Sequence, residues 1–474
     1  MTAEPQRTTV GVLGGGLAGL SAACALAEAG FVVTLLERRP YLGGRASSYQ
    51  HPGTEEIVDN CQHVLLGCCT NLIDFYRRLG VADKIQWFER LNFIEPGGRI
   101  SVIQASPLPA PFHNAPSFAR AAFLDIADKD AIARGLFFLA MSPPRDGQED
   151  FLSWLKRHAQ TERGIERFWK PVLVSALNED LDRMAAMYAA QVFRESFLKS
   201  RAAGRMGVPR VPLSELYGAA GDYLTSRGGK VLNRFPVERM EAAADKVVIT
   251  GNNQRLDFDY AVPAVPFDAL LKMLPSDQSA QPLRDQLARF ETSPITGIHL
   301  WFDRQITPLP HAVLLDRTIQ WMFHKSMLQN RQPRGDTGSY VELVVSSSKS
   351  LVETGRQDII DLALRELAEF FPEARQAKLI KATVIKEINA TYSALPQSDS
   401  YRPRTATVWP RIFLAGDWTF TGWPATMEGA VRSGYAAAEA VFDFAVAVAA
   451  TGNPKKFRVP DLPASGFMRL AEYL

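Results

Sequence analysis

The sequence lacks the cysteine patterns of a metal-binding or disulfide-rich protein. Its 474 residues include only four cysteines, Cys24, Cys61, Cys68 and Cys69, and no two of them form a C-x-x-C pair. Adjacent cysteines rarely both bind one tetrahedral metal ion, so the spacing argues against zinc. We therefore expect reduced thiols and no metal site.

Charge of one sign and long apolar runs are also scarce. The formal net charge is +2, without a dense Lys/Arg block, which gives no reason to expect nucleic acid as a partner. The best apolar run, residues 436–450, contains Glu439 and Asp443 and is too short to span a membrane. Residues 1–8 are too few and too polar for a secretion signal. We expect a cytosolic protein and leave contact with a membrane surface open.

What the sequence does contain is a glycine-rich turn near the N-terminus. Residues 9–13 predict a buried strand, residues 21–29 predict a helix, and between them runs Gly14-Gly15-Gly16-Leu17-Ala18-Gly19. Gly14 permits a tight turn, Gly16 lets the backbone approach a pyrophosphate, and Gly19 lets the helix pack close to the strand. Glu37 ends the next apolar run, 18 residues past Gly19 (37 − 19), near the spacing needed to reach a ribose hydroxyl. The unit predicts a dinucleotide site with the pyrophosphate at the helix N-terminus.

Two further segments favour FAD as the dinucleotide. Gly43-Gly44-Arg45 resembles the second fingerprint of the FAD-dependent amine oxidase and phytoene desaturase superfamily, in which the glycine pair passes close to the cofactor's phosphates. Near the C-terminus an apolar strand ends at Gly416-Asp417, and a helix begins near Met427, as in the same superfamily. A carboxylate there can accept hydrogen bonds from ribityl or ribose hydroxyls, and a helix N-terminus can stabilise a reduced, anionic flavin.

The resemblance covers essentially the whole chain and implies a set of cofactor contacts. Val237 is assigned from the family alone, because the matching segment there pairs with adenine through backbone groups. The residues expected to contact FAD are Gly14, Gly16, Leu17, Ala18, Gly19, Glu37, Arg38, Gly43, Gly44, Arg45, Val237, Gly416, Asp417 and Met427.

A narrower resemblance concerns the string Asp59-Asn60-Cys61-Gln62-His63, together with Gly67-Cys68-Cys69, and the loop at residues 419–424. Both are similar to hydroxysqualene dehydroxylases, which implies FADH2-dependent reduction of hydroxysqualene to squalene, a C30 prenyl lipid, on the way to hopanoids. His63 is the first candidate for the catalytic proton donor, although it also suits a structural histidine; Gln62, Tyr392 or a bound water are alternatives. A phytoene-type desaturase, a flavin amine oxidase and a non-catalytic prenyl-lipid-binding flavoprotein remain open.

The order of these segments predicts an α/β fold with discontinuous domains. A Rossmann-like FAD-binding domain would comprise residues 1–75, 205–270 and 390–450, and a substrate domain residues 76–204 and 271–389. The substrate domain would combine a mixed β-sheet with a helical part at about 117–204, and residues 451–474 would form a C-terminal tail.

Overall fold

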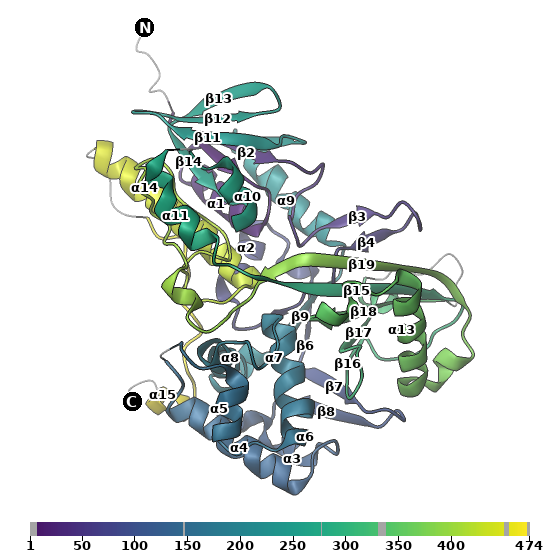
Figure 1. The fold of residues 1–474 in the computed structure, drawn as a ribbon. Helices are drawn as coiled ribbons and strands as arrows, with labels where there is room; N and C mark the ends of the chain where they lie inside the picture. The colour runs from purple at the N-terminus through teal and green to yellow at the C-terminus, as the bar shows by residue number, and fades with distance from the viewer. Residues whose placement is uncertain (1–6, 146, 276, 330–337, 450–454, 472–474) are drawn as a thin grey trace.

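The computed structural model describes residues 7–145, 147–275, 277–329, 338–449 and 455–471. Figure 1 shows a small parallel sheet at one end of the molecule, a long mixed sheet across its middle, and a group of helices at the other end. The first and last long helices, α1 and α14, pack side by side at the end that holds the parallel sheet, whereas the C-terminal helix α15 lies near the helical group.

The first sheet contains four parallel strands in the order β10-β2-β1-β14. Residues 411–415, expected as a further strand, lie along β14 at the edge of this sheet: Ile412 forms an isolated parallel bridge with Ala261, and the Phe413 and Ala415 N–H groups donate to the Ala261 and Pro263 carbonyls. Phe413 also bridges back to Ala406. The bounds are β1 Thr9–Leu13, β2 Val32–Glu37, β10 Lys230–Asn233 and β14 Tyr260–Pro263.

Three helices cover this sheet: α1 Leu17–Glu28, α9 Leu213–Thr225 and α14 Met427–Ala449. Helix α1 is buried along almost its whole length because α14 crosses it closely. At the crossing, a Cβ on Gly434 would lie 2.1 Å from Ser21 Oγ, so only glycine fits. Helix α2, Thr70–Arg78, is tied to the start of α14, since the Glu428 carboxylate accepts hydrogen bonds from the Asn71 and Leu72 backbone N–H groups.

The second sheet has seven strands in the order β19-β15-β18-β17-β16-β7-β8. One face packs against helix α13, Arg356–Phe370, through alternate residues such as Ile298 and Leu343. The intervening residues, including His299 and its partner Glu342, point to the face opposite α13. The bounds are β7 Arg90–Ile94, β8 Ile100–Gln104, β15 Thr292–Phe302, β16 His311–Leu314, β17 Trp321–His324, β18 Ser339–Ser346 and β19 Leu379–Tyr392.

Three smaller sheets connect these parts. The sheet β5-β9-β6 brings residues 65–66, 206–209 and 85–88 together, and so joins segments that we assigned to different domains. The bounds are β3 Ser48–Gln50, β4 Ile57–Asp59, β5 Leu65–Leu66, β6 Ile85–Phe88, β9 Met206–Pro209, β11 Val237–Ala242, β12 Val247–Gly251 and β13 Gln254–Phe258. The domain limits stay a prediction.

The helical part extends from α3 to a 3₁₀ turn that ends at Gly204, close to the expected limits. Its core is aromatic, and the ring of Trp169 contacts the rings of both Trp154 and Phe193. The bounds are α3 Ala115–Arg120, α4 Ile126–Met141, α5 Phe151–Arg157, α6 Glu162–Gly164, α7 Lys170–Leu177 and α8 Ala186–Phe193; shorter helices elsewhere are α10 Phe267–Met273, α11 Gln281–Leu287, α12 Lys325–Leu328 and α15 Met468–Ala471.

Candidate active site

The first glycine turn has the geometry of an anion-binding helix start. Gly14 has φ +102°, and a Cβ on Gly19 would lie 1.9 Å from the Gly14 carbonyl oxygen. Gly16 caps α1 with extended backbone and no side-chain hydrogen bond, and the first helical turn has no acidic residue. The free N–H groups of Leu17 and Ala18 and the positive helix end suit a pyrophosphate.

The second glycine pair lies directly against the first turn. Gly43 forms a bridge with Gly16, and its N–H donates to the Gly15 carbonyl at 2.8 Å. Gly44 has φ +61°, and a Cβ there would lie 2.9 Å from the Gly16 Cα. A Cβ on Gly16, by contrast, would meet nothing closer than 3.9 Å. Packing within the protein therefore does not require glycine at position 16. The approach of a phosphate group to the backbone would require it.

Glu37 is buried at the end of β2, and both its carboxylate oxygens accept backbone hydrogen bonds. The donors are the N–H groups of Gly15, at 2.6 Å, and Arg39, at 2.7 Å. Since a carboxylate has about four lone-pair sites, capacity remains for ribose hydroxyls. Arg38 is exposed beside it, whereas Arg39, which we did not single out, donates to the Gly44 carbonyl.

Val237 begins β11 close to Glu37 in space. The Phe235 N–H donates to the Glu37 carbonyl at 2.9 Å, and Val237 itself is half-buried, opposite Gly251. The adenine-binding role of Val237 stays a prediction, and the position of the strand beside the expected ribose site fits it.

The C-terminal segment meets the second glycine pair through an ion pair. Arg45 Nη2 lies 2.7 Å from Asp417 Oδ1, although 372 residues separate them in sequence. Gly416 has φ +148°, and its N–H donates to Ser433 Oγ on α14 at 2.8 Å. A small pocket borders the ion pair, lined by Arg45, Asp417, Trp418, Tyr392, Phe267 and Asp268, among others. Met427 starts α14, and Tyr217 donates to its Sδ.

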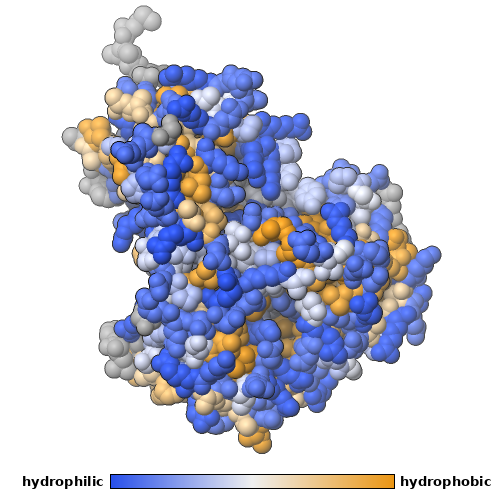
Figure 2. Space-filling view, viewed as in Figure 1, coloured by the Kyte–Doolittle hydropathy of each residue, from blue (hydrophilic) through white to orange (hydrophobic). Residues whose placement is uncertain are grey.

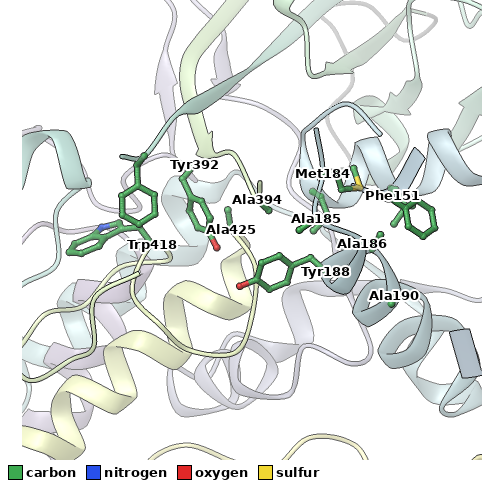
Figure 3. Packing of buried hydrophobic residues seen from close by; sticks show 14 of the residues in the cluster. Phe151, Met184, Ala185, Ala186, Tyr188, Ala190, Tyr392, Ala394, Trp418 and Ala425 are labelled. Atoms are coloured by element: carbon green, nitrogen blue, oxygen red, sulfur yellow. The ribbon is translucent and has the colours of Figure 1, made fainter. Parts of the chain in front are cut away.

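A buried arginine holds the loop that follows Asp417, and sequence reasoning did not identify it. Arg402 donates to the backbone carbonyls of Asp417, Thr419 and Trp423 and to the Tyr188 hydroxyl. Figure 3 shows Tyr188 and Tyr392 with their hydroxyls directed toward one another, and Trp418 beyond Tyr392. Burial raises the pKa of the Tyr392 phenol, which makes that hydroxyl a weak acid.

His63 is half-buried and is held by its own loop. Its Nδ1 lies 2.7 Å from the Cys61 carbonyl, which can only accept, so Nδ1 carries the proton. Burial lowers the His63 pKa, and the neutral ring then presents Nε2 as an acceptor. The proton-donor role of His63 stays a prediction, but it would require protonation of a ring whose surroundings favour the neutral form.

The string at residues 59–63 also meets a buried lysine that the sequence gave us no reason to choose. Lys325 Nζ lies 2.6 Å from Asp59 Oδ2, 2.8 Å from Gln62 Oε1 and 3.3 Å from Glu342 Oε2. Burial lowers the Lys325 pKa, but Asp59 and Glu342 more than compensate, and the pKa is raised. We call Asp59, Lys325 and Glu342 the buried charge cluster.

The described residues contain no group of three or more His, Cys, Asp or Glu side chains placed to hold a metal ion. Within the same ranges, no helix is both long enough and apolar enough to cross a membrane.

Comparison with known proteins identifies relatives over most of the chain. The family model for flavin-containing amine oxidoreductases matches residues 17–442. The 15-cis-phytoene desaturase of Synechococcus elongatus is 28% identical over 459 residues, which cover 91% of this chain and 95% of that protein.

Solved structures share the fold at lower identity. An oxidoreductase from Methanosarcina mazei superposes with a TM-score of 0.71 at 16% identity, covering 90% of this chain and 99% of that one. Cyclohexylamine oxidase from Brevibacterium oxydans gives a TM-score of 0.66 at 16% identity, covering 94% of this chain and 100% of that one.

Proposed function

Because the chain belongs to the flavin-containing amine oxidoreductase family, its cofactor is FAD, and we propose that it reduces hydroxysqualene to squalene. Family membership makes it a flavin-dependent oxidoreductase with the expected α/β fold. The substrate and the direction of electron flow are the proposed part.

The observation that carries the proposal is the apolar environment of the string at residues 59–63. Cys61 packs in an apolar layer between the β5-β9-β6 sheet and the long sheet's face opposite α13. The layer includes Met206, Val208, Phe323, Leu328 and Val344. A C30 prenyl chain needs such an apolar surface, and the polar string at its edge suits a single hydroxyl group.

The chain's own residues have three tasks in this reaction. Bound FAD supplies the hydride chemistry. The two glycine turns and Glu37 would hold its adenosine diphosphate part, and Arg45 and Asp417 would hold the chain between its phosphates and its flavin ring. The apolar layer would exclude water from an allylic cation, and a nearby acid must protonate the leaving hydroxyl.

The direct test is an anaerobic reoxidation. Pre-reduced protein mixed with detergent-solubilised hydroxysqualene should regain the oxidised flavin spectrum while squalene forms, measured by gas chromatography with mass spectrometry. Flavin that stays reduced while no squalene appears would refute the proposal.

A phytoene-type desaturase is the second candidate, favoured by the 28% identity to the Synechococcus elongatus enzyme. It predicts the opposite electron flow, in which phytoene bleaches the oxidised flavin. Peroxide release from amines would instead identify an amine oxidase, and no reaction with any of these compounds would leave a lipid-binding flavoprotein.

We also propose that the helical end of the molecule contacts an anionic membrane surface. Exposed apolar side chains gather there, and Figure 2 shows hydrophobic surface at the lower tip, where Figure 1 places α3 and α4. Phe137 and Phe467 are 61% and 57% exposed, and Phe467 contacts the ring of Phe112, which is itself 53% exposed. Exposed Lys156 and Arg469 on adjoining segments would favour anionic headgroups.

Vesicle sedimentation tests this contact. The double variant Phe137→Ser/Phe467→Ser should lose binding to phosphatidylglycerol vesicles that the wild type retains. Val408→Ser is the matched control, because Val408 is 66% exposed but lies outside the helical part. Equal sedimentation of all three proteins would refute the proposed surface.

A further inference from the structure

The buried charge cluster contains two carboxylates and one ammonium group, and the two carboxylates have very different surroundings. Asp59 accepts hydrogen bonds from Lys325, Ser48 Oγ, the Leu213 N–H and Gln329. Glu342 is 0% exposed; its Oε2 lies 3.3 Å from Lys325 Nζ, and among the described residues neither of its oxygens accepts a well-directed hydrogen bond. A single cation therefore serves two carboxylates, and almost all hydrogen bonding goes to Asp59.

This asymmetry decides which carboxylate keeps a proton. Burial works to raise the Asp59 pKa, but the Lys325 charge and the hydrogen bonds override it and hold the pKa at about 2. Burial raises the pKa of Glu342 to about 7, although Lys325 works to lower it. Environments that separate the pKa values of paired carboxyl groups commonly assign one of them as an acid.

The other groups that face Glu342 are neutral. His299 lies directly opposite on β15, and burial together with Lys325 lowers its pKa to about 3. Its Nε2 also lacks a partner among the described residues. Burial raises the pKa of the Cys61 thiol well above its usual range. Among the described residues, the charged groups that act on Glu342 are thus Lys325 and Asp59, and they pair with each other.

Glu342 also lies at the boundary between polar and apolar surroundings. Its neighbours on the face opposite α13 are Phe323, paired with it on β17, and Val344, two residues further along β18. Both belong to the apolar layer of Cys61. The buried carboxyl group of Glu342 therefore lies at the edge of this apolar layer, close to the string at residues 59–63.

Resting on the proposed reduction of hydroxysqualene, we propose that Glu342 is the catalytic acid that protonates the leaving hydroxyl group, with Lys325 and Asp59 as positioning residues. The Glu342 proton goes to the hydroxyl oxygen, and the C–O bond breaks with its electron pair leaving in water. A hydride supplied by bound FADH2 forms the new C–H bond, so the substrate is reduced and the cofactor is oxidised. Glu342 is left as a carboxylate, and it is reprotonated by the second hydrogen of FADH2, which the oxidised cofactor releases to solvent as a proton.

The first experiment needs no turnover. Infrared spectra of the FAD-bound wild type should contain the C=O stretch of a protonated carboxylic acid, which disappears as the pH rises through about 7. The band should be missing in Glu342→Gln and retained in the control Glu353→Gln, since Glu353 is exposed. A wild-type spectrum without the band at about pH 5 would overturn the proposal.

The second experiment follows reoxidation of pre-reduced enzyme by hydroxysqualene across the pH range. Glu342→Gln should lower the rate by about 10²- to 10⁴-fold and abolish the decline above neutral pH. Glu342→Asp should recover part of the rate, and Glu353→Gln should match the wild type. FAD content and circular dichroism confirm that each variant is folded.

The outcomes distinguish failure of the proposed role of Glu342 from failure of the proposed reaction. Wild-type protein that forms squalene, together with a Glu342→Gln variant of unchanged rate and pH profile, overturns the role of Glu342 alone. Wild-type protein that does not consume hydroxysqualene overturns the proposed reaction and this role with it.

Discussion

The glycine turns and the buried charge cluster use two different means to prepare a site. The turns at residues 14–19 and 43–45 act through backbone: free N–H groups, positive φ angles and close contacts that exclude a Cβ. The cluster acts through side chains from β4, α12 and β18, and 266 residues separate Asp59 from Lys325. Backbone geometry for an anion can be encoded within a few adjacent residues, whereas paired charges must be assembled from distant parts of the chain.

The two regions also differ in how they tolerate change. A substitution in a glycine turn should mainly weaken ligand binding, because the space that the new side chain fills is the space that the ligand would occupy. A buried ion cluster fails by losing stability, because each charge left behind is unpaired in the interior. Four predictions test this difference, in order of expected size.

The largest effect should follow from Lys325→Met. Removal of the ammonium group leaves Asp59 buried without its cation, which should lower the free energy of unfolding by about 3–5 kcal/mol. Urea unfolding followed by circular dichroism measures it. The double variant Lys325→Met/Asp59→Asn should recover part of the loss, and an unchanged midpoint in the single variant would show that the cluster is not a stabilising pair.

Gly16→Val should abolish tight FAD binding while the protein stays folded. A Cβ at Gly16 has 3.9 Å of clearance from the protein, so the side chain would occupy the expected phosphate position. Each backbone hydrogen bond lost to the charged phosphate costs about 1.5–3 kcal/mol, so the dissociation constant for FAD should rise at least ~100-fold. Titration of the apoprotein measures it.

The control for Gly16→Val is Gly218→Ala on α9. The Cβ added at position 218 meets nothing within 4 Å, and the FAD affinity of this variant should be unchanged. Wild-type affinity in Gly16→Val would place the phosphates elsewhere.

The stability of the wild type should fall as the pH rises, relative to Glu342→Gln. The Glu342 pKa is raised from 4.5 to about 7 in the folded state, so the folded protein holds a proton that the unfolded chain has released. The stability contribution of that proton is complete below pH 4.5 and is lost as the pH rises toward about 7. Between about pH 5 and pH 8 the wild type should lose about 2–3 kcal/mol more than the variant. Parallel pH profiles of unfolding free energy would contradict the raised pKa.

Glu37→Gln should have the smallest effect, a roughly 10- to 100-fold loss of FAD affinity, because it removes a charged hydrogen-bond acceptor. The amide oxygen can still accept from one backbone N–H, at Gly15 or Arg39, so the apoprotein should remain folded. Isothermal titration calorimetry measures the change, and an unaltered dissociation constant would exclude Glu37 from the ribose site.

Much of the secondary structure could be predicted from local patterns. The helix expected at residues 21–29 is α1, and the helix expected near Met427 is α14. The segment expected as a strand at residues 411–415 forms isolated bridges and backbone hydrogen bonds, and its partners Ala261 and Pro263 on β14 are far away in the sequence. Local periodicity reports which residues are apolar, but it does not report which partners they meet.

The sequence by itself determined the fold class, the FAD cofactor and the positions of the glycine turns, because these depend on residues close together in the chain. Only the tertiary structure decided that Arg402 lies beneath the loop after Asp417, that Arg45 pairs with Asp417, and that Lys325 is shared by two carboxylates of unequal hydrogen bonding. Lysine and arginine side chains look like solvated surface residues in a sequence. Their burial follows only from the charges that the fold places beside them, and the raised pKa of Glu342 follows from its own burial in the interior.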